Sequence, residues 1–137
     1  MGIEEKYRRD EEEIRKTMPP VYVAFMDYSK DLRRMTQTIR ADVRDVAIKL
    51  RNLTFDSIAC CFVAANTFDI EKKVFNLLKV LENTDINFAG LHYLREHEGI
   101  SIGQYGELTH RLMKAEKQVG NWLNTERRRT GSASTEH

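Results

Sequence analysis

Hydrophobic residues between Ser101 and Trp122 recur at alternating spacings of three and four. This period places them on one stripe of an α-helix that packs against other helices. The stripe consists of Tyr105, Leu108, Leu112, Ala115, Val119 and Trp122. At its start, Ser101 and Gln104 have the spacing of a capping box, in which each side chain accepts a hydrogen bond from the backbone amide of the other residue. The pattern predicts a helix over residues 101–128.

Two glycines near this helix have predicted structural roles. Gly99 is placed to close the preceding helix, because glycine is common just past a helix end. Gly120 is expected to let a neighbouring backbone approach, since it has no side chain. We therefore expect Trp122 to anchor the seam beside Gly120, and a large residue at position 120 to push the helix outward.

Three further stripes of the same period precede this one and predict three more helices. The first stripe contains Val21, Phe25, Tyr28, Leu32, Met35 and Ile39. The second contains Val43, Val46, Leu50, Leu53, Ser57, Cys60 and Ala64. The third contains Ile70, Val74, Leu77, Leu81, Thr84, Phe88 and Leu91. Together the four stripes predict helices over about residues 20–38, 42–66, 69–97 and 101–128.

The connections between the predicted helices are only a few residues long. Short connections make sequential helices antiparallel neighbours. The predicted fold class is therefore all-α, an antiparallel up-down-up-down four-helix bundle that forms one domain over residues 19–129. Residues 1–18 are a charged N-terminal extension able to form a helix of its own. Residues 130–137 are low in complexity and are expected to be disordered.

Six large apolar residues lie off the four stripes and should face outward. They are Tyr22, Phe62, Phe68, Phe75, Ile86 and Tyr93. Exposed apolar groups that gather on a surface mark protein interfaces. We therefore expect the chain to self-associate.

Composition and charge limit the function classes. The 137 residues carry a formal net charge of +1 and the pI is near 7.8, whereas dedicated nucleic-acid binders have a basic pI and a dense basic stripe. The densest basic cluster is Arg127 to Arg129, which either binds nucleic acid or complements the negative end of the helix dipole. The sequence has no apolar run of about eighteen residues and does not begin like a signal peptide. We therefore expect a cytoplasmic protein with no membrane contact.

The sequence contains no catalytic or metal-binding constellation, so we predict no catalytic residues, no metal site and no cofactor. Glu107 precedes His110 by three residues, but a di-metal carboxylate bundle needs such a pair on each of two helices. His92 and His97 are five residues apart, whereas a metal-binding helix face needs a spacing of three or four.

Polar and sulfur-containing residues also fall within the predicted core. Cys60 and Cys61 are neighbours inside one helix, and we interpret them as reduced thiols. Ser57, Thr84 and Asp85 lie near the middle of their helices. We interpret them as hydroxyls satisfied within the helix or as hydrogen bonds that fix register, and not as a ligand site.

Four segments resemble a family of small four-helix-bundle proteins of bacteria. They are MPPVYVAFMDY at 18–28, FVAANT at 62–67, ISIGQYGEL at 100–108 and QVGNWL at 118–123. The family includes proteins encoded by intervening sequences in ribosomal RNA genes, and Avd, the accessory variability determinant of diversity-generating retroelements. The likeness extends over residues 19 to about 125, with Tyr22, Asn66, Gly120 and Trp122 as its anchors.

The resemblance implies a function that the helical pattern itself does not contain. Avd-like proteins form homopentamers, associate with the reverse transcriptase of the retroelement and bind nucleic acid during the synthesis of mutagenised complementary DNA. By resemblance, this chain is a non-catalytic accessory protein that binds a reverse transcriptase and its template RNA or cDNA. The alternative is a protein of the ribosomal intervening-sequence kind, with a structural or unknown role.

One departure from Avd moves the expected nucleic-acid contacts. Avd has arginines in the middle of its third helix, where this chain has Glu82, Asn83, Thr84 and Asp85. We therefore expect nucleic acid to contact the basic residues of the other helices. They are Arg33, Arg34, Arg40, Arg44, Lys49, Arg51, Arg127, Arg128 and Arg129.

Overall fold

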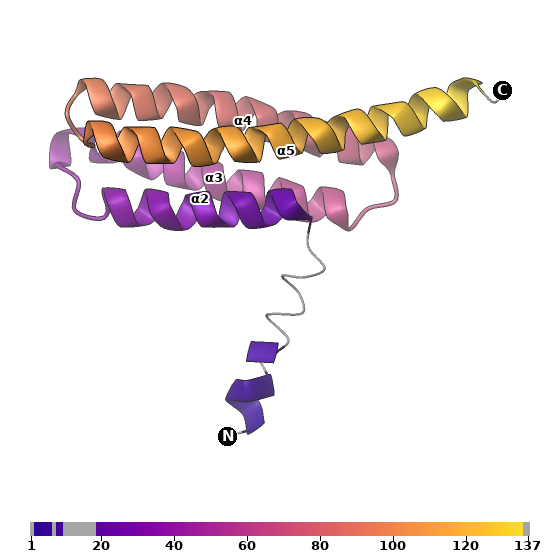
Figure 1. The fold of residues 1–137 in the computed structure, drawn as a ribbon, viewed down its shortest axis with the longest axis horizontal. Helices are drawn as coiled ribbons and strands as arrows, with labels where there is room; N and C mark the ends of the chain where they lie inside the picture. Colours follow the sequence, from indigo (N-terminus) through magenta and orange to yellow (C-terminus); the bar gives the residue numbers. More distant parts are fainter. Residues whose placement is uncertain (1, 7, 10–18, 136–137) are drawn as a thin grey trace.

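The computed structural model describes residues 2–6, 8–9 and 19–135, and over these residues the chain is helical and contains no strand (Figure 1). The prediction of an all-α fold is confirmed. The long helices are α2 (Pro20–Thr36), α3 (Arg44–Ala65), α4 (Ile70–Glu96) and α5 (Ile102–Thr135), and the short 3-10 helix η1 (Ala41–Val43) precedes α3. Of the charged extension, residues 2–6 and 8–9 are helical and residues 10–18 lie outside the described part.

Each long helix packs closely against two of the others. Helix α2 contacts α3 and α5, and helix α4 contacts the same two helices. Figure 1 shows the four helices side by side, with the chain passing from one to the next at alternate ends. Because α5 is the longest, its C-terminal part projects beyond the other three.

Two helix ends differ from the sequence prediction. Helix α2 ends at Thr36, where Arg51 of α3 donates a hydrogen bond of 2.6 Å to the Thr36 carbonyl oxygen. Helix α5 continues to Thr135, so residues 130–135 extend the helix where we had predicted a disordered tail. No proline interrupts this segment, so nothing in it breaks the helix outright, although Gly131 and the threonines favour a helix only weakly.

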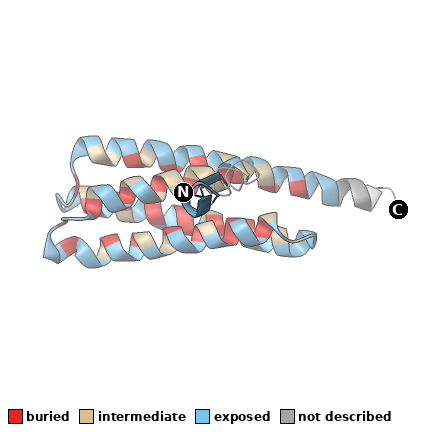
Figure 2. Cartoon of the chain, turned by 90° about the horizontal axis from the view of Figure 1, so that it is seen from below, coloured by how far each residue is buried: buried red, intermediate tan, exposed pale blue. Residues whose placement is uncertain are grey.

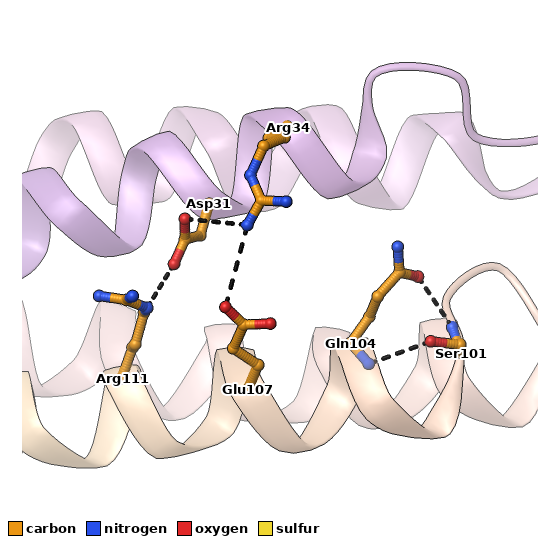
Figure 3. A network of polar contacts seen from close by, with 6 residues as sticks. All are labelled: Asp31, Arg34, Ser101, Gln104, Glu107 and Arg111. Atoms are coloured by element: carbon orange, nitrogen blue, oxygen red, sulfur yellow. Dashed lines mark hydrogen bonds and ion pairs between the residues drawn. The ribbon is translucent and has the colours of Figure 1, made fainter.

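The start of α5 is capped as predicted (Figure 3). The Ser101 backbone amide donates to Gln104 Oε1 at 3.0 Å, and the Gln104 amide donates to Ser101 Oγ at 3.0 Å. The capping box is therefore confirmed.

The residue that closes α4 is Glu98, not Gly99. Glu98 has a φ of 58° in the left-handed region, and the Gly99 amide donates to the Leu94 carbonyl oxygen at 2.7 Å. Position 99 needs glycine for space, because a Cβ there would lie 2.9 Å from Val43 Cγ2. The expected role of Gly99 as the helix-closing residue was therefore wrong.

Buried side chains from all four long helices form one core, and Figure 2 marks the buried residues in red along each helix. The largest fully buried side chains are Phe25, Tyr28, Leu32, Leu50, Leu77, Leu91, Leu94, Leu108 and Leu112. Trp122, expected as the anchor of the seam, is half-buried and packs at the edge of this core, while Leu123 beside it is buried.

A buried hydrogen-bond cluster joins α2, α3 and α4. The Tyr28 hydroxyl donates to Asn87 Oδ1 at 3.0 Å, and Thr54 Oγ1 donates to the same oxygen at 3.3 Å. Asn87 Nδ2 in turn donates to the Asn83 carbonyl oxygen at 3.0 Å. Burial raises the pKa of Tyr28 above its usual range, so this hydroxyl remains a donor at neutral pH.

The polar residues predicted for the core behave differently from this cluster. Ser57 and Thr84 are buried, and their hydroxyls donate to carbonyl oxygens one turn earlier in their own helices. This confirms the interpretation of hydroxyls satisfied within a helix. Asp85 is exposed, so its assignment to the core was wrong.

The position in a helix where only glycine fits without a clash is Gly90, not Gly120. A Cβ at Gly90 would lie 2.3 Å from Leu50 Cδ2, whereas a Cβ at Gly120 would meet nothing within 4 Å. The predicted backbone approach at Gly120 is therefore absent, and α4 instead comes close to α3 at Gly90.

This contrast gives a matched pair of variants. Gly90→Ala is expected to destabilise the fold by about 1–2 kcal/mol, because overpacking costs about 1–3 kcal/mol and helix propensity returns at most about 1 kcal/mol. Gly120→Ala is expected to stabilise it by about 0.5–1 kcal/mol. Urea unfolding followed by circular dichroism measures both changes. Equal effects of the two substitutions would contradict this packing.

Candidate nucleic-acid interface

The predicted basic residues lie in two separate groups. Six of them belong to the end of the molecule where α2 ends and α3 begins: Arg33, Arg34, Arg40, Arg44, Lys49 and Arg51. The other three, Arg127, Arg128 and Arg129, lie on the part of α5 at the opposite end (Figure 1). The structure therefore does not bring all of them onto one surface.

Three arginines of the first group meet in one surface hollow. Arg33, Arg34 and Gln37 of the α2 end and Arg51 of α3 line a hollow of about 310 Å³, which we call the basic hollow. Arg33 and Arg34 lie in the last turn of α2, where cations complement the negative end of the helix dipole. The packing of α3 against α2 adds Arg51 to them.

Arg51 is fixed in place by the end of α2. Its Nε and Nη2 donate to Thr36 Oγ1 at 3.0 and 2.7 Å, and Nη2 also donates to the Thr36 carbonyl oxygen at 2.6 Å. The last of these bonds adds a short partner to a carbonyl at the helix end, which also accepts from the Ile39 amide at 3.3 Å. The bonds of Arg51 to Thr36 use Nε and Nη2, which leaves Nη1 for a ligand.

Arg34 belongs to an ion-pair network between α2 and α5 (Figure 3). Its Nη2 lies 3.3 Å from Asp31 Oδ1 and 3.9 Å from Glu107 Oε1, and Arg111 pairs with the other oxygen of Asp31. The Arg34 and Glu107 side chains are exposed, and Asp31, which is only 15% exposed, keeps Arg111 as a second partner, so the pairs of Arg34 contribute little to stability. A phosphate in the basic hollow would therefore compete with a weak partner for Arg34.

Arg40 and Arg44 do not line the basic hollow. Arg40 donates to Asp42 Oδ1 at 3.1 Å and to the His97 carbonyl oxygen, so it joins the α2–η1 and α4–α5 connections. Its hydrogen bond and charge hold the pKa of the Asp42 carboxyl below its usual range. Arg44 donates to the Ile39 carbonyl oxygen at 3.3 Å. Both arginines have roles within the chain that require no nucleic acid.

The remaining predicted residues are exposed on other surfaces. Lys49, Arg127 and Arg128 point to solvent. Arg129 Nη1 lies 3.5 Å from Oε1 of Glu126, a carboxylate that is only 3% exposed. Sequence reasoning missed Glu126, although it lies four residues after Trp122 and so continues the helical stripe that faces the core.

Exposed apolar side chains are numerous along α3 and α4. In these two helices they are Ile48, Phe55, Phe62, Val63, Ile70, Phe75, Leu78, Ile86 and Tyr93. Phe68, in the connection between the helices, is also fully exposed. Of the six residues predicted to face outward, only Tyr22 is half-buried and packs against the core. We call the surface formed by the nine exposed residues of α3 and α4 together with Phe68 the α3–α4 apolar face.

The described residues contain no cluster of three or more histidine, cysteine, aspartate or glutamate side chains that could hold a metal ion. Glu107 faces Arg34, and His92 Nε2 lies 4.0 Å from Glu96 Oε1. Both cysteines are buried and unpaired by disulfides, and burial raises the pKa of Cys61 to about 12. Among the helices that the structure describes, none is long and apolar enough to cross a bilayer.

No family model, curated protein or solved structure matches this chain.

Proposed function

We propose that this chain is an up-down-up-down four-helix-bundle protein that acts, without catalysis, as an accessory protein of a diversity-generating retroelement. In this role it binds template RNA and the reverse transcriptase in the cytoplasm and supports mutagenic cDNA synthesis. The observation that carries RNA binding is the basic hollow, in which Arg33, Arg34 and Arg51 converge. The retroelement setting rests on the resemblance to Avd.

The chemistry of the basic hollow suits a phosphate of an RNA backbone. A guanidinium group is always charged and can donate two parallel hydrogen bonds to phosphate oxygens. Because the net charge of the chain is only +1, affinity must come from such a local cluster and not from the field of the whole surface. Arg51 is held in place by Thr36 before RNA arrives, so less side-chain entropy is lost on binding.

The α3–α4 apolar face supports the protein part of the proposal. Phe55 and Phe75 are each 67% exposed, and Phe68 between the two helices is fully exposed. A grouped set of large apolar side chains is typical of an interface between chains. We assign it to a homo-oligomer, which the Avd resemblance makes a pentamer, with the reverse transcriptase as a further partner.

The second candidate is a protein of the ribosomal intervening-sequence kind with a structural role. The observation that favours it is that Arg34, Arg40, Arg44 and Arg51 all bind groups of their own chain. Under this reading the arginines stabilise helix ends and connections. It predicts no binding to structured RNA at physiological salt and no complex with a reverse transcriptase.

A double substitution separates the two candidates. Arg33→Gln with Arg34→Gln is expected to weaken binding of a structured RNA about 10- to 100-fold. It should reduce the salt slope by about 1.4–1.8, since each lost phosphate contact contributes about 0.7 for a single strand and about 0.9 for a duplex. Fluorescence anisotropy in a salt series measures both. Stability should change by less than about 1 kcal/mol, because the Arg34 side chain is exposed and Asp31 keeps its ion pair with Arg111.

The matched control removes two positive charges elsewhere on the surface. Lys30→Gln with Lys114→Gln changes the net charge equally, but neither lysine lines the basic hollow. It should leave RNA affinity within about twofold. If wild type fails to bind RNA, or if both double variants lose equal affinity, RNA binding by the basic hollow is refuted.

A further inference from the structure

The basic hollow holds more positive charge than one backbone phosphate can neutralise. Among the described residues its lining consists of Arg33, Arg34, Gln37 and Arg51, without a carboxylate. A phosphodiester inside an RNA strand carries one negative charge. A phosphate at the end of a strand is a phosphomonoester and carries about −1.5 to −2 at neutral pH. The lining of the hollow therefore suits the more highly charged group.

The ion-pair network beside the hollow contributes to the same balance of charge. Arg34 contacts Asp31 and Glu107, and Arg111 pairs with the second oxygen of Asp31. The three arginines of the hollow and Arg111 together face two carboxylates, so the hollow and the network carry a formal charge of +2. A phosphomonoester neutralises this charge, whereas a phosphodiester leaves about half of it uncompensated.

The two carboxylates also limit the path of an RNA strand. Glu107 reaches Arg34 from α5, and Asp31 precedes Arg34 by one turn of α2 (Figure 3). A strand that continued past Arg34 toward α5 would bring its next phosphate up to these carboxylates, and like charges repel each other. A strand that ends in the hollow extends from it in one direction only and avoids them.

The donors of the hollow match the oxygens of a terminal phosphate. Such a phosphate has three oxygens outside the chain, whereas a phosphate inside the strand has two. The bonds of Arg51 to Thr36 leave Nη1 for one oxygen. Arg33 and Arg34 are exposed, so each guanidinium can turn toward another oxygen. Three guanidinium groups are therefore available for three oxygens.

We propose that the basic hollow binds the terminal phosphate of an RNA strand, with Arg33, Arg34 and Arg51 as donors to its oxygens. This inference rests on the RNA binding proposed above and specifies which phosphate the hollow takes. A 5′-phosphate, a 3′-phosphate and free inorganic phosphate share this chemistry, and the experiment separates them.

Single-stranded RNA oligomers that differ only at one end test the proposal. At constant salt, an internally labelled oligomer with a 5′-phosphate should bind the full-length chain about tenfold more tightly than the same oligomer with a 5′-hydroxyl. This gain corresponds to about one additional charge-assisted hydrogen bond. A 3′-phosphorylated oligomer shows which end the hollow takes, and a gain with either phosphate supports the proposal.

Inorganic phosphate is the competitor that tests the other source. It lacks the remaining contacts of a strand, so it should displace the 5′-phosphorylated oligomer only at concentrations of about 1 mM or more. Displacement at micromolar concentrations would assign the hollow to free phosphate and overturn the proposal.

The pH dependence shows whether the second negative charge is recognised. The second pKa of a phosphomonoester is about 6, so the group carries close to two charges at about pH 7.5 and close to one at about pH 5. The tenfold preference should therefore fall to about twofold at the lower pH. The 5′-hydroxyl oligomer corrects for titration of the protein itself. A preference that stays the same at both pH values would contradict recognition of the second charge.

A matched pair of variants tests the assigned donors. Arg51→Gln should reduce the preference for the 5′-phosphate to about threefold or less. Lys49→Gln removes a charge from the same helix outside the hollow and should leave the preference unchanged. If Arg51→Gln is unfolded by circular dichroism, Arg33→Gln decides, because Arg33 is exposed. An unchanged preference in the folded variant would refute the assigned contacts.

The Arg33 and Arg34 double variant separates failure of this inference from failure of the proposed function. It should weaken binding of both oligomers and remove the difference between them. Equal binding of both oligomers by wild type, with weaker binding by the double variant, would overturn the terminal-phosphate site and leave the proposed function standing. Absence of RNA binding by wild type would refute the proposed function and this inference with it.

Discussion

Replacing Asn87 with alanine is expected to destabilise the chain by about 2–4 kcal/mol, the largest stability effect we predict for a polar residue. Asn87 Oδ1 accepts hydrogen bonds from Tyr28 of α2 and Thr54 of α3. Tyr28 is fully buried, so without Asn87 its hydroxyl would lie in the core without that acceptor. The shorter side chain would also leave a cavity between three helices.

Asn76→Ala is the matched control for this experiment. Asn76 lies on the same helix, and its Nδ2 also donates to a backbone carbonyl oxygen one turn earlier, that of Lys72, at 2.8 Å. Tyr28 and Thr54 bond to Asn87 and not to Asn76, so we expect a loss below about 0.5 kcal/mol for Asn76→Ala. Urea unfolding measures the loss of stability in both variants. Similar losses for Asn76→Ala and Asn87→Ala would show that the buried cluster does not hold the helices together.

The second large effect concerns the oligomeric state. Wild-type protein at micromolar concentration should have a mass by light scattering that is a multiple of 16.0 kDa, and the Avd resemblance implies a pentamer. Phe55→Glu with Phe75→Glu should give a species of 16.0 kDa, because two charges on the α3–α4 apolar face cannot be desolvated on association. The helical content should stay the same, since both side chains are 67% exposed.

Met113→Glu tests whether a charge placed at any exposed apolar residue would dissociate the oligomer. Met113 is 59% exposed and lies on α5, outside the α3–α4 apolar face. This variant should keep the wild-type mass. A wild-type mass near 16 kDa would contradict self-association, and dissociation by Met113→Glu would place the interface on another helix.

Local features of this fold could be predicted from the sequence. The helical stripes and the Ser101–Gln104 capping box depend on residues a few positions apart, so their spacing alone defines them. The stripes also left six large apolar residues outside the core, and five of them are exposed, whereas Tyr22 is half-buried. Such features need no knowledge of how one helix lies on another.

Features that depend on contacts between distant residues could not be predicted. The need for glycine at position 90 is set by Leu50, forty residues earlier, and the predicted role of Gly120 failed for the same reason. Asn87 meets Tyr28 across 59 positions. Sequence periodicity gives the face of each helix, but it does not give the axial offset between neighbouring helices.

In the candidate site, too, the residue types could be predicted from the sequence and the contacts between distant residues could not. The sequence singled out nine basic residues, but only packing shows that Arg33, Arg34 and Arg51 meet while Arg40 and Arg44 bind the connections. Glu126 was missed altogether, because a carboxylate in a run of charged residues is normally solvated. Its burial follows from the placement of α5 against the starts of α2 and α4.

The most direct test of the proposed function is co-purification of the tagged full-length chain from cells that encode it. The proposal predicts that a reverse transcriptase and its template RNA are recovered with the wild-type chain. It also predicts that the Arg33 and Arg34 double variant recovers less of the RNA. Recovery of neither the enzyme nor the RNA would contradict the accessory role and favour the structural alternative.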